Sequence, residues 1–196
     1  MLTYVEENRS KQIVYENFLY NQYTAISVGG TFSQLIQSGI KNPIGIVIVP
    51  LISTVAVPLL GGAGFGFSQY GSSYDTCPAT YAPLSLTNLQ VTLGGVNVMN
   101  TNIFYTFENY MEQVSLAESL TSADIGISTG LISQSYWEQN RCYYVDLSRG
   151  RQADKDTMRN LCVTFNNNSN VIIDVLIFTL YLDKFVIDVE TGIIVK

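Results

Sequence analysis

The side chains that carry most enzymatic chemistry are missing from this sequence or scattered along it. The 196 residues include no histidine, which excludes a Ser-His-Asp triad, a Cys-His pair and a histidine-ligated metal. Three cysteines, Cys77, Cys142 and Cys162, lack the C-x-x-C spacing of a zinc site, and their odd number does not suit a disulfide framework. We therefore expect no cofactor, no metal site and three buried thiols in a reducing compartment.

Four acidic residues near the C-terminus remain as candidates for acid/base catalysis or calcium binding: Asp174, Asp183, Asp188 and Glu190. Three of them fall around predicted strand ends, where a carboxylate is usually solvated. Asp174 is different because it lies inside the apolar run "VIIDVLIF". We expect it on a solvent-facing side or paired with an arginine such as Arg159, rather than in catalysis. The sequence thus predicts a protein without catalytic residues.

Glycines and aromatic residues offer two further chemistries. The stretch "GGAGFGFSQYG" is rich in glycine, but it lacks the G-x-x-x-x-G-K-[ST] pattern and any nearby lysine that would reach a phosphate. The 13 tyrosines and one tryptophan are compatible with sugar stacking, with Tyr136-Trp137 and Tyr143-Tyr144 as candidates. Aromatic residues equally mark protein interfaces and sandwich cores, which is the more common outcome.

An uncharged run between Lys41 and Asp75 is long enough to cross a bilayer, so membrane insertion of residues 44–67 is one alternative. Pro50, Pro58 and five glycines argue against a membrane helix there. The β-branched residues between Pro43 and Pro50 predict a core strand over Ile44–Val49. Residues 50–73 read as a long apolar loop, whose expected use is to be covered by another molecule.

Charge is scarce, and it is unevenly distributed. Charged residues make up 13% of the chain, against roughly 25% in a typical globular domain. No lysine or arginine lies between Lys41 and Arg141, so a monomer would have few charges to hydrate the surface of this half of the chain. Burial against copies of the same chain would remove the need for such charges. The net charge of −6 speaks against nucleic-acid binding by bulk electrostatics, and we expect no direct sequence-specific binding of nucleic acid. Basic and acidic residues alternate in the polar loop at 148–159, which we interpret as solvated.

Strand patterns dominate the remaining sequence. We expect one or two strands before Gly29-Gly30, a hairpin around Gly94-Gly95, a strand at Cys142–Leu147, and three C-terminal strands in "NLCVTFNN", "VIIDVLIFTLYL" and "KFVIDVETGIIVK". "TFSQLIQSG" carries a capping-box pattern and a terminal glycine, which predict a two-turn helix. "TNIFYTFENYMEQVSLAESL" predicts an amphipathic helix. Together these elements predict a β-sandwich.

The order of these elements resembles the second, C-terminal jelly roll of double jelly-roll major capsid proteins, the hexon-type proteins of icosahedral DNA viruses. Within that group it is most similar to the Polinton-like virus and virophage proteins. The stretches that carry the resemblance are "TFSQLIQSGIKNPIGIVIVP", "FSQYGSSYDTCPAT", "LTNLQVTLGGVNV", "YTFENYMEQV", "YWEQNRCYYVDLSR" and "RNLCVTFNNNSNVIIDVLIFTLYLDKFVIDVETG". They span almost the whole chain.

The resemblance implies one mainly β domain over residues 1–196, an eight-stranded antiparallel jelly-roll β-sandwich with one or two short helices. It implies a viral structural protein, located in the virion and made in the host cytoplasm or nucleus. The N-terminal stretch "MLTYVEENRS" shows no secretory signal, so we expect that the protein is not secreted. Because family members with two jelly rolls form trimers, a single one implies a fragment, a separately made half, or a homo-oligomer such as a trimer, pentamer or hexamer. Its partners would be copies of itself and other capsid subunits.

An apolar surface is expected to mediate that assembly. The candidate subunit interface comprises Pro50, Leu51, Ile52, Val55, Val57, Leu59, Leu60, Phe65, Phe67, Tyr136 and Trp137. The alternative function is a carbohydrate- or protein-binding β-sandwich in which Trp137 and nearby tyrosines form an exposed platform.

Overall fold

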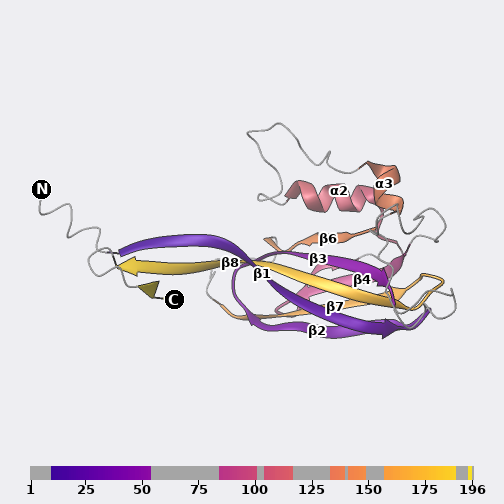
Figure 1. Ribbon diagram of the computed structural model, residues 1–196, viewed down its shortest axis with the longest axis horizontal. Helices are drawn as coiled ribbons and strands as arrows, with labels where there is room; N and C mark the ends of the chain where they lie inside the picture. The colour runs from indigo at the N-terminus through magenta and orange to yellow at the C-terminus, as the bar shows by residue number, and fades with distance from the viewer. Residues whose placement is uncertain are drawn as a thin grey trace, which may run out of the picture.

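The computed structural model describes residues 10–53, 84–100, 104–116, 133–139, 141–148, 157–188 and 194–195. Within these ranges the chain forms two sheets that face each other (Figure 1). The first sheet has the order β1 (Ser10–Ile26), β8 (Ile173–Asp188), β3 (Pro43–Ile52) and β6 (Tyr143–Asp146), with β9 (Ile194–Val195) pairing β8. The second has the order β2 (Thr31–Ile40), β7 (Arg159–Asn167), β4 (Leu86–Leu93) and β5 (Val96–Asn100).

The strand pairs are nested. β1 pairs with β8, β2 with β7, β3 with β6 and β4 with β5, all antiparallel, so the first strand meets the last of the eight and the pairing proceeds inward. Two more antiparallel contacts, β3 with β8 and β4 with β7, complete the sheets. This is the arrangement obtained when one long eight-strand hairpin rolls into a sandwich. The jelly-roll fold predicted from the sequence is confirmed.

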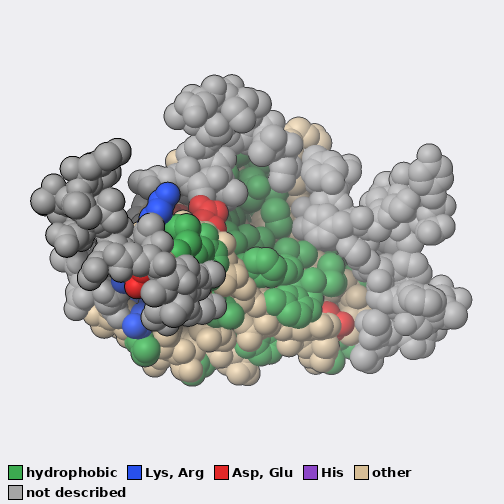
Figure 2. Space-filling model, turned by 60° about the vertical axis from the view of Figure 1, so that its left-hand side comes forward, with side chains coloured by type: hydrophobic (Ala, Val, Ile, Leu, Met, Phe, Trp, Pro, Cys, Tyr) green, Lys and Arg blue, Asp and Glu red, His purple; other side chains and the backbone are tan. Residues whose placement is uncertain are grey.

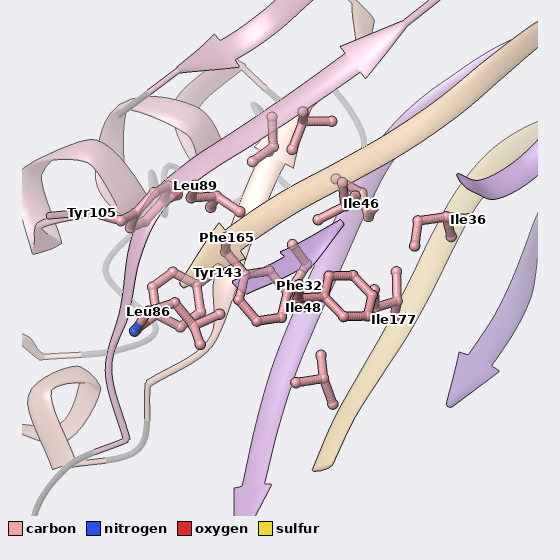
Figure 3. Packing of buried hydrophobic residues seen from close by; sticks show 14 of the residues in the cluster. Phe32, Ile36, Ile46, Ile48, Leu86, Leu89, Tyr105, Tyr143, Phe165 and Ile177 are labelled. Carbon is pink, nitrogen blue, oxygen red and sulfur yellow. The ribbon is translucent and has the colours of Figure 1, made fainter. Parts of the chain in front are cut away.

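The core lies between the two sheets, where alternate residues of each strand point inward. Phe32 of β2 stacks on Phe165 of β7 with ring centroids 4.6 Å apart. Ile48 of β3 and Ile177 of β8 approach this pair from the opposite sheet (Figure 3). Ile46 and Ile48 of β3 are fully buried and Ile44 is 6% exposed, which confirms the core strand predicted at residues 44–49.

One end of the molecule extends beyond the sandwich. β1 and β8 continue together past the other strands (Figure 1), with Ser10 opposite Asp188 and Glu16 opposite Leu182. β3 pairs with β8 only as far as Tyr181, so these segments form a two-stranded ribbon, flanked by β9 near its tip. We call residues 10–16 and 182–188 the terminal ribbon. No residue of the buried core cluster belongs to it.

Two helices pack outside the first sheet. α2 (Phe107–Leu116) begins after Thr106, whose backbone N–H donates to Asn109 Oδ1 at 3.0 Å, while the Asn109 N–H donates to Thr106 Oγ1 at 3.4 Å. This reciprocal cap confirms the amphipathic helix and explains its start. α2 lies along β6 (Figure 1), and its Val114 packs with Tyr144. The Tyr144 ring lies over Gly45 so closely that a Cβ there would be 2.8 Å from its Cε2.

The helix predicted for "TFSQLIQSG" is wrong, because these residues form β2. Phe32, Ile36 and Ile40 point into the core, each at most 6% exposed. Their four-residue spacing satisfies both the helical and the strand period, so the pattern was ambiguous. Pairing along β7 and the stacking of Phe32 on Phe165 outweigh the local capping signal.

Three predicted boundaries also differ. Residues 50–52, assigned to the apolar loop, continue β3, and Pro50 is tolerated there because β6 pairs β3 only from Gly45 to Ile48, leaving an edge. The predicted break after Leu182 does not occur. β8 runs on to Asp188 because its second half pairs with β1. Arg159, placed in the polar loop, begins β7.

Candidate interaction surface

The predicted interface residues fall in three places. Pro50, Leu51 and Ile52 belong to β3, where Ile52 is buried in the core while Leu51 is partly exposed on the outer side. Trp137 lies in α3 (Gln134–Gln139), as does Tyr136. Six others lie outside the described residues: Val55, Val57, Leu59, Leu60, Phe65 and Phe67. The interface itself therefore stays a prediction.

Trp137 does not form an exposed platform. It is 2% exposed, its Nε1–H donates to the Cys142 carbonyl at 2.9 Å, and the Arg141 guanidinium lies 5.4 Å from its ring centroid. α3 thus uses its tryptophan to attach to the start of β6. The alternative function of sugar stacking required the Trp137 ring to be exposed to solvent. Its burial removes the main residue on which that alternative was based.

The tyrosines around Trp137 are structural as well. Tyr143 is fully buried and its hydroxyl accepts the Leu86 N–H at 2.9 Å, joining β6 to β4 of the opposite sheet. Burial raises the pKa of Tyr143, and it raises that of Tyr105, which donates to the Tyr144 carbonyl. Burial, with smaller contributions from Cys142, raises the pKa of Tyr110 to about 12. These hydroxyls stay protonated at neutral pH and satisfy buried polar groups.

Asp174 also has a structural partner. It is 7% exposed, and its Oδ1 accepts the backbone N–H of Ala25 at 2.8 Å. Ala25 has φ +60°, at the point where the β1–β8 register shifts between Tyr23 and Ile26. The carboxylate therefore holds a bulge, and it is neither solvent-facing nor catalytic in its contacts. Asp183 lies within β8 and accepts the Tyr15 hydroxyl at 2.8 Å.

No group of three or more acidic or cysteine side chains in the described ranges could hold a metal ion. Cys142 and Cys162 are free thiols of intermediate exposure, and Cys77 lies outside the described residues. No helix among the described residues has the length and apolar character needed to span a membrane. Ile44–Ile52, the first part of the segment considered for insertion, is strand β3.

The surface that sequence reasoning missed is the outer side of the first sheet. Phe18 and Tyr20 of β1 are 59% and 49% exposed, and both contact Phe178 of β8, with ring centroids 6.3 and 5.4 Å apart. We call this side, where α2 does not cover it, the outer apolar face. Hydrophobic side chains gather across the middle of one face of the molecule in Figure 2. The sequence contains this pattern, because every second residue of β1 lies on the same side: Val14, Glu16, Phe18, Tyr20 and Gln22. Three of these five side chains are apolar or aromatic.

Strand register extends the outer apolar face from β1 to β3. Phe178 lies opposite Val47, Leu176 opposite Val49, and Leu180 opposite Gly45. The valine, leucine and phenylalanine side chains of this set are partly exposed, whereas Gly45 is buried beneath Tyr144. The inward residues between them are buried. Beyond Val47 the face meets Tyr144 and α2. Such a surface carries no nucleophile or acid pair and is suited to contact with another apolar surface.

A pocket of about 380 Å³ lies where the terminal ribbon leaves the sandwich. Leu19, Ile40 and Tyr181 supply apolar walls, and Lys41 and Lys184 lie beside it. Both signs of charge are present because Asp183 also lines it. Both carboxylate oxygens of Asp183 already accept hydrogen bonds, one from the Tyr15 hydroxyl and one from the Lys184 backbone N–H.

Two solved structures resemble this fold. A chain of the 3.5 Å cryo-EM structure of the Sputnik virophage matches with a TM-score of 0.50 and 16% sequence identity over 94% of this chain. The crystal structure of PBCV-1 VP54 fitted into a cryo-EM reconstruction of the virophage Sputnik matches with a TM-score of 0.33 and 12% identity over 86% of this chain. This chain spans 39% of the first and 43% of the second. No protein-family model and no curated protein matches the sequence. At the level of the fold, the resemblance to a virophage protein is confirmed.

Proposed function

We propose that this chain is a structural subunit of a viral capsid, a jelly-roll domain that assembles through apolar surfaces with copies of itself and with other capsid subunits. The observation that carries the proposal is the complete set of eight nested strands, matched over 94% of the chain to a protein of a virophage. The outer apolar face adds support, because a stable monomer rarely leaves several large apolar side chains together in solvent.

The composition supports the same function. A chain with 13% charged residues has little to keep its surface hydrated. Burial between subunits removes that need, since interface centres are depleted of charge and enriched in aromatic residues. The proposal places the protein in the virion, after synthesis in the host cytoplasm or nucleus and without secretion. It assigns no catalytic role.

The test is the native mass of the purified chain, measured by size-exclusion chromatography with light scattering and followed by electron microscopy. We expect a trimer, pentamer or hexamer of the 21.7 kDa chain, or larger particles. A monomer at every concentration, with no particles, would contradict self-assembly.

A matched pair of variants locates the contact. Phe18 and Val96 are each 59% exposed, but Phe18 belongs to the outer apolar face and Val96 to β5 of the other sheet. We expect Phe18→Asp to shift the native mass toward the monomer, because a buried unpaired carboxylate is costly. Val96→Asp should leave it unchanged. Equal effects of the two variants would show that the outer face is not a specific contact.

A further inference from the structure

The four outermost strands of the two sheets differ in how well their open edges are protected. β6 and β5 are short, with 4 and 5 residues, and short edges offer little backbone to another chain. β2 has 10 residues, but its register shifts twice along β7, between Leu35 and Gln37 and between Gln37 and Ile40. Irregularities of this kind discourage edge-to-edge pairing.

β1 has none of these protections over most of its length. It contains 17 residues, and the pairing from Ser10 to Tyr23 runs along β8 without a register shift. Its sequence, SKQIVYENFLYNQYTAI, includes no proline and no glycine. Lysine, the usual edge-blocking residue, occurs once, as Lys11. Among the described residues, β1 pairs with β8 alone and its other edge is open.

The direction of the backbone groups identifies which residues face this open edge. In an antiparallel pair, alternate residues direct their N–H and C=O groups toward opposite edges of the strand. The Phe18 N–H donates to the side chain of the preceding Asn17 at 2.9 Å, a local substitute for a strand partner. We conclude that even-numbered residues, from Gln12 to Gln22, point their main-chain groups to the open edge.

The terminal ribbon gives a second reason to expect another strand at the open edge of β1. A two-stranded ribbon is marginal in water, and β9 adds a third strand only at Val186 and Ile187. Ile13 and Phe185 lie opposite each other on one face, and Val14 is 55% exposed on the other. A further strand along β1 would widen the ribbon and cover apolar side chains that are now partly in solvent.

The neutral edge of β1 is suited to a second copy of this chain as the source of that further strand. The whole chain carries a net charge of −6, so two copies repel except where they meet at an uncharged surface. Lys11 and Glu16 are the two charged residues of β1 and cancel each other. A two-fold contact requires a self-complementary surface, and a neutral strand edge pairing antiparallel with itself fulfils that condition.

We propose that the open edge of β1 pairs antiparallel with the β1 edge of a second copy, about a two-fold axis perpendicular to the first sheet. The first sheets of the two copies then form one continuous sheet. Because such an axis keeps equivalent faces on the same side, the outer apolar faces of the two copies join next to Phe18 and Tyr20. This inference rests on the proposed function and deepens it by naming one contact between subunits, a two-fold contact that fits within a hexamer or between two neighbouring trimers or pentamers.

The experiment combines an edge-blocking variant with backbone hydrogen exchange. Gln22→Pro removes an edge-directed N–H and leaves the pairing with β8 in place, since proline is tolerated on open edges. Because the contact is two-fold, the substitution removes one main-chain hydrogen bond in each copy, two per dimer. We therefore expect the dimer dissociation constant to rise about tenfold or more. Gln22→Thr is the matched control, because it loses the same side chain and keeps the N–H. It should dimerise like the original chain.

Hydrogen exchange measured by NMR at increasing concentration tests the pairing directly. We expect the odd-numbered amides of β1 to be protected at every concentration, because they pair with β8. The even-numbered amides of Val14, Glu16 and Tyr20 should become protected only as the dimer forms. A dimer whose even-numbered amides keep exchanging freely would overturn the proposal, as would a monomeric original chain.

A second variant guards against misfolding of the proline variant. Glu16→Lys leaves the backbone intact but gives each β1 two positive charges, so we expect weaker dimerisation that recovers at high salt. Glu16→Gln should have a smaller effect. Dimers with protected even-numbered amides but no particles would support the edge and contradict the capsid function. Particles that form equally well with Gln22→Pro would contradict the edge and leave the function standing.

Discussion

At the scale of single residues, the carboxylate that stood out in the sequence proves to be a backbone support. Asp174 accepts the N–H of Ala25, a residue with φ +60° at the β1 bulge. A non-glycine residue in that region is uncommon and needs local stabilisation. An acid inside an apolar strand correctly indicated that this position has a special role. Its meaning depended on a residue 149 positions away.

Replacing Asp174 tests this role. Asp174→Ala removes the acceptor of the Ala25 N–H from a partly buried hydrogen bond, and we expect a loss of about 1 kcal/mol in the free energy of unfolding. Asp174→Asn keeps an oxygen acceptor at the same position and should lose less. Urea denaturation of the two variants provides the measurement, and equal losses would contradict the hydrogen-bond explanation.

The buried tyrosines predict a loss of stability in alkali. Burial raises the pKa of Tyr110 to about 12, whereas the unfolded chain titrates at its ordinary value of 10.0. Between these values the unfolded state releases the proton first, so the free energy of unfolding is fully present below pH 10 and falls as the pH rises toward 12. Tyr105 and Tyr143 act in the same direction.

Thermal unfolding at pH 7, 10 and 11 measures this effect. The unfolding temperature should decrease between pH 10 and 11, and Tyr110→Phe should reduce that decrease without abolishing it. A stability that stays constant over this range would contradict the burial of these hydroxyls.

At the scale of elements, the terminal ribbon is separable from the sandwich. None of the buried core cluster lies in residues 10–16 or 182–188. A chain trimmed to residues 17–181 should therefore still unfold cooperatively, with an unfolding temperature lowered by less than about 5 °C. Circular dichroism during heating is sufficient. Loss of cooperative unfolding would show that the ribbon is needed for the fold.

Elements with a single period in the sequence were predictable, and elements whose identity depends on a distant partner were not. β3 and the β4–β5 hairpin followed from β-branched runs and Gly94-Gly95, and α2 followed from its apolar stripe. The prediction for β2 was wrong because the four-residue spacing of its apolar residues fits both a helix and a strand. The predicted end of β8 was wrong because Asp183 looks like a turn residue in the sequence, and only the structure places Tyr15 opposite it.

The candidate surface was less predictable than the fold. Trp137 was expected at an interface, yet α3 turns it into the core. The outer apolar face depends on which side of β1 is left uncovered by α2, and that is a property of the packed molecule. The alternation along β1 reveals two sides but does not indicate which one meets the other sheet.

At the scale of the whole molecule, the capsid proposal extends to the apolar segment after β3, which lies outside the described residues. The prediction from the sequence is that Val57 and Leu60 contact neighbouring subunits. We expect the double variant Val57→Asp, Leu60→Asp to keep the native circular dichroism spectrum and to lose assembly, as measured by light scattering. The variant Val57→Thr, Leu60→Thr adds no charge and should assemble more fully. Loss of the native spectrum would place these residues in the core.

The nested strand pairing also determines when each part of the chain is able to fold. Hairpin β4–β5 joins neighbours in the sequence, whereas Tyr15 and Asp183 are 168 positions apart. Closing a loop costs more entropy as it lengthens, so the innermost pair is expected to form first and β1 with β8 last. During synthesis β1 leaves the ribosome before the other seven strands of the sandwich and waits until β8 has been made. Its long open strand is therefore exposed on both edges throughout translation, which makes β1 the segment most in need of a chaperone.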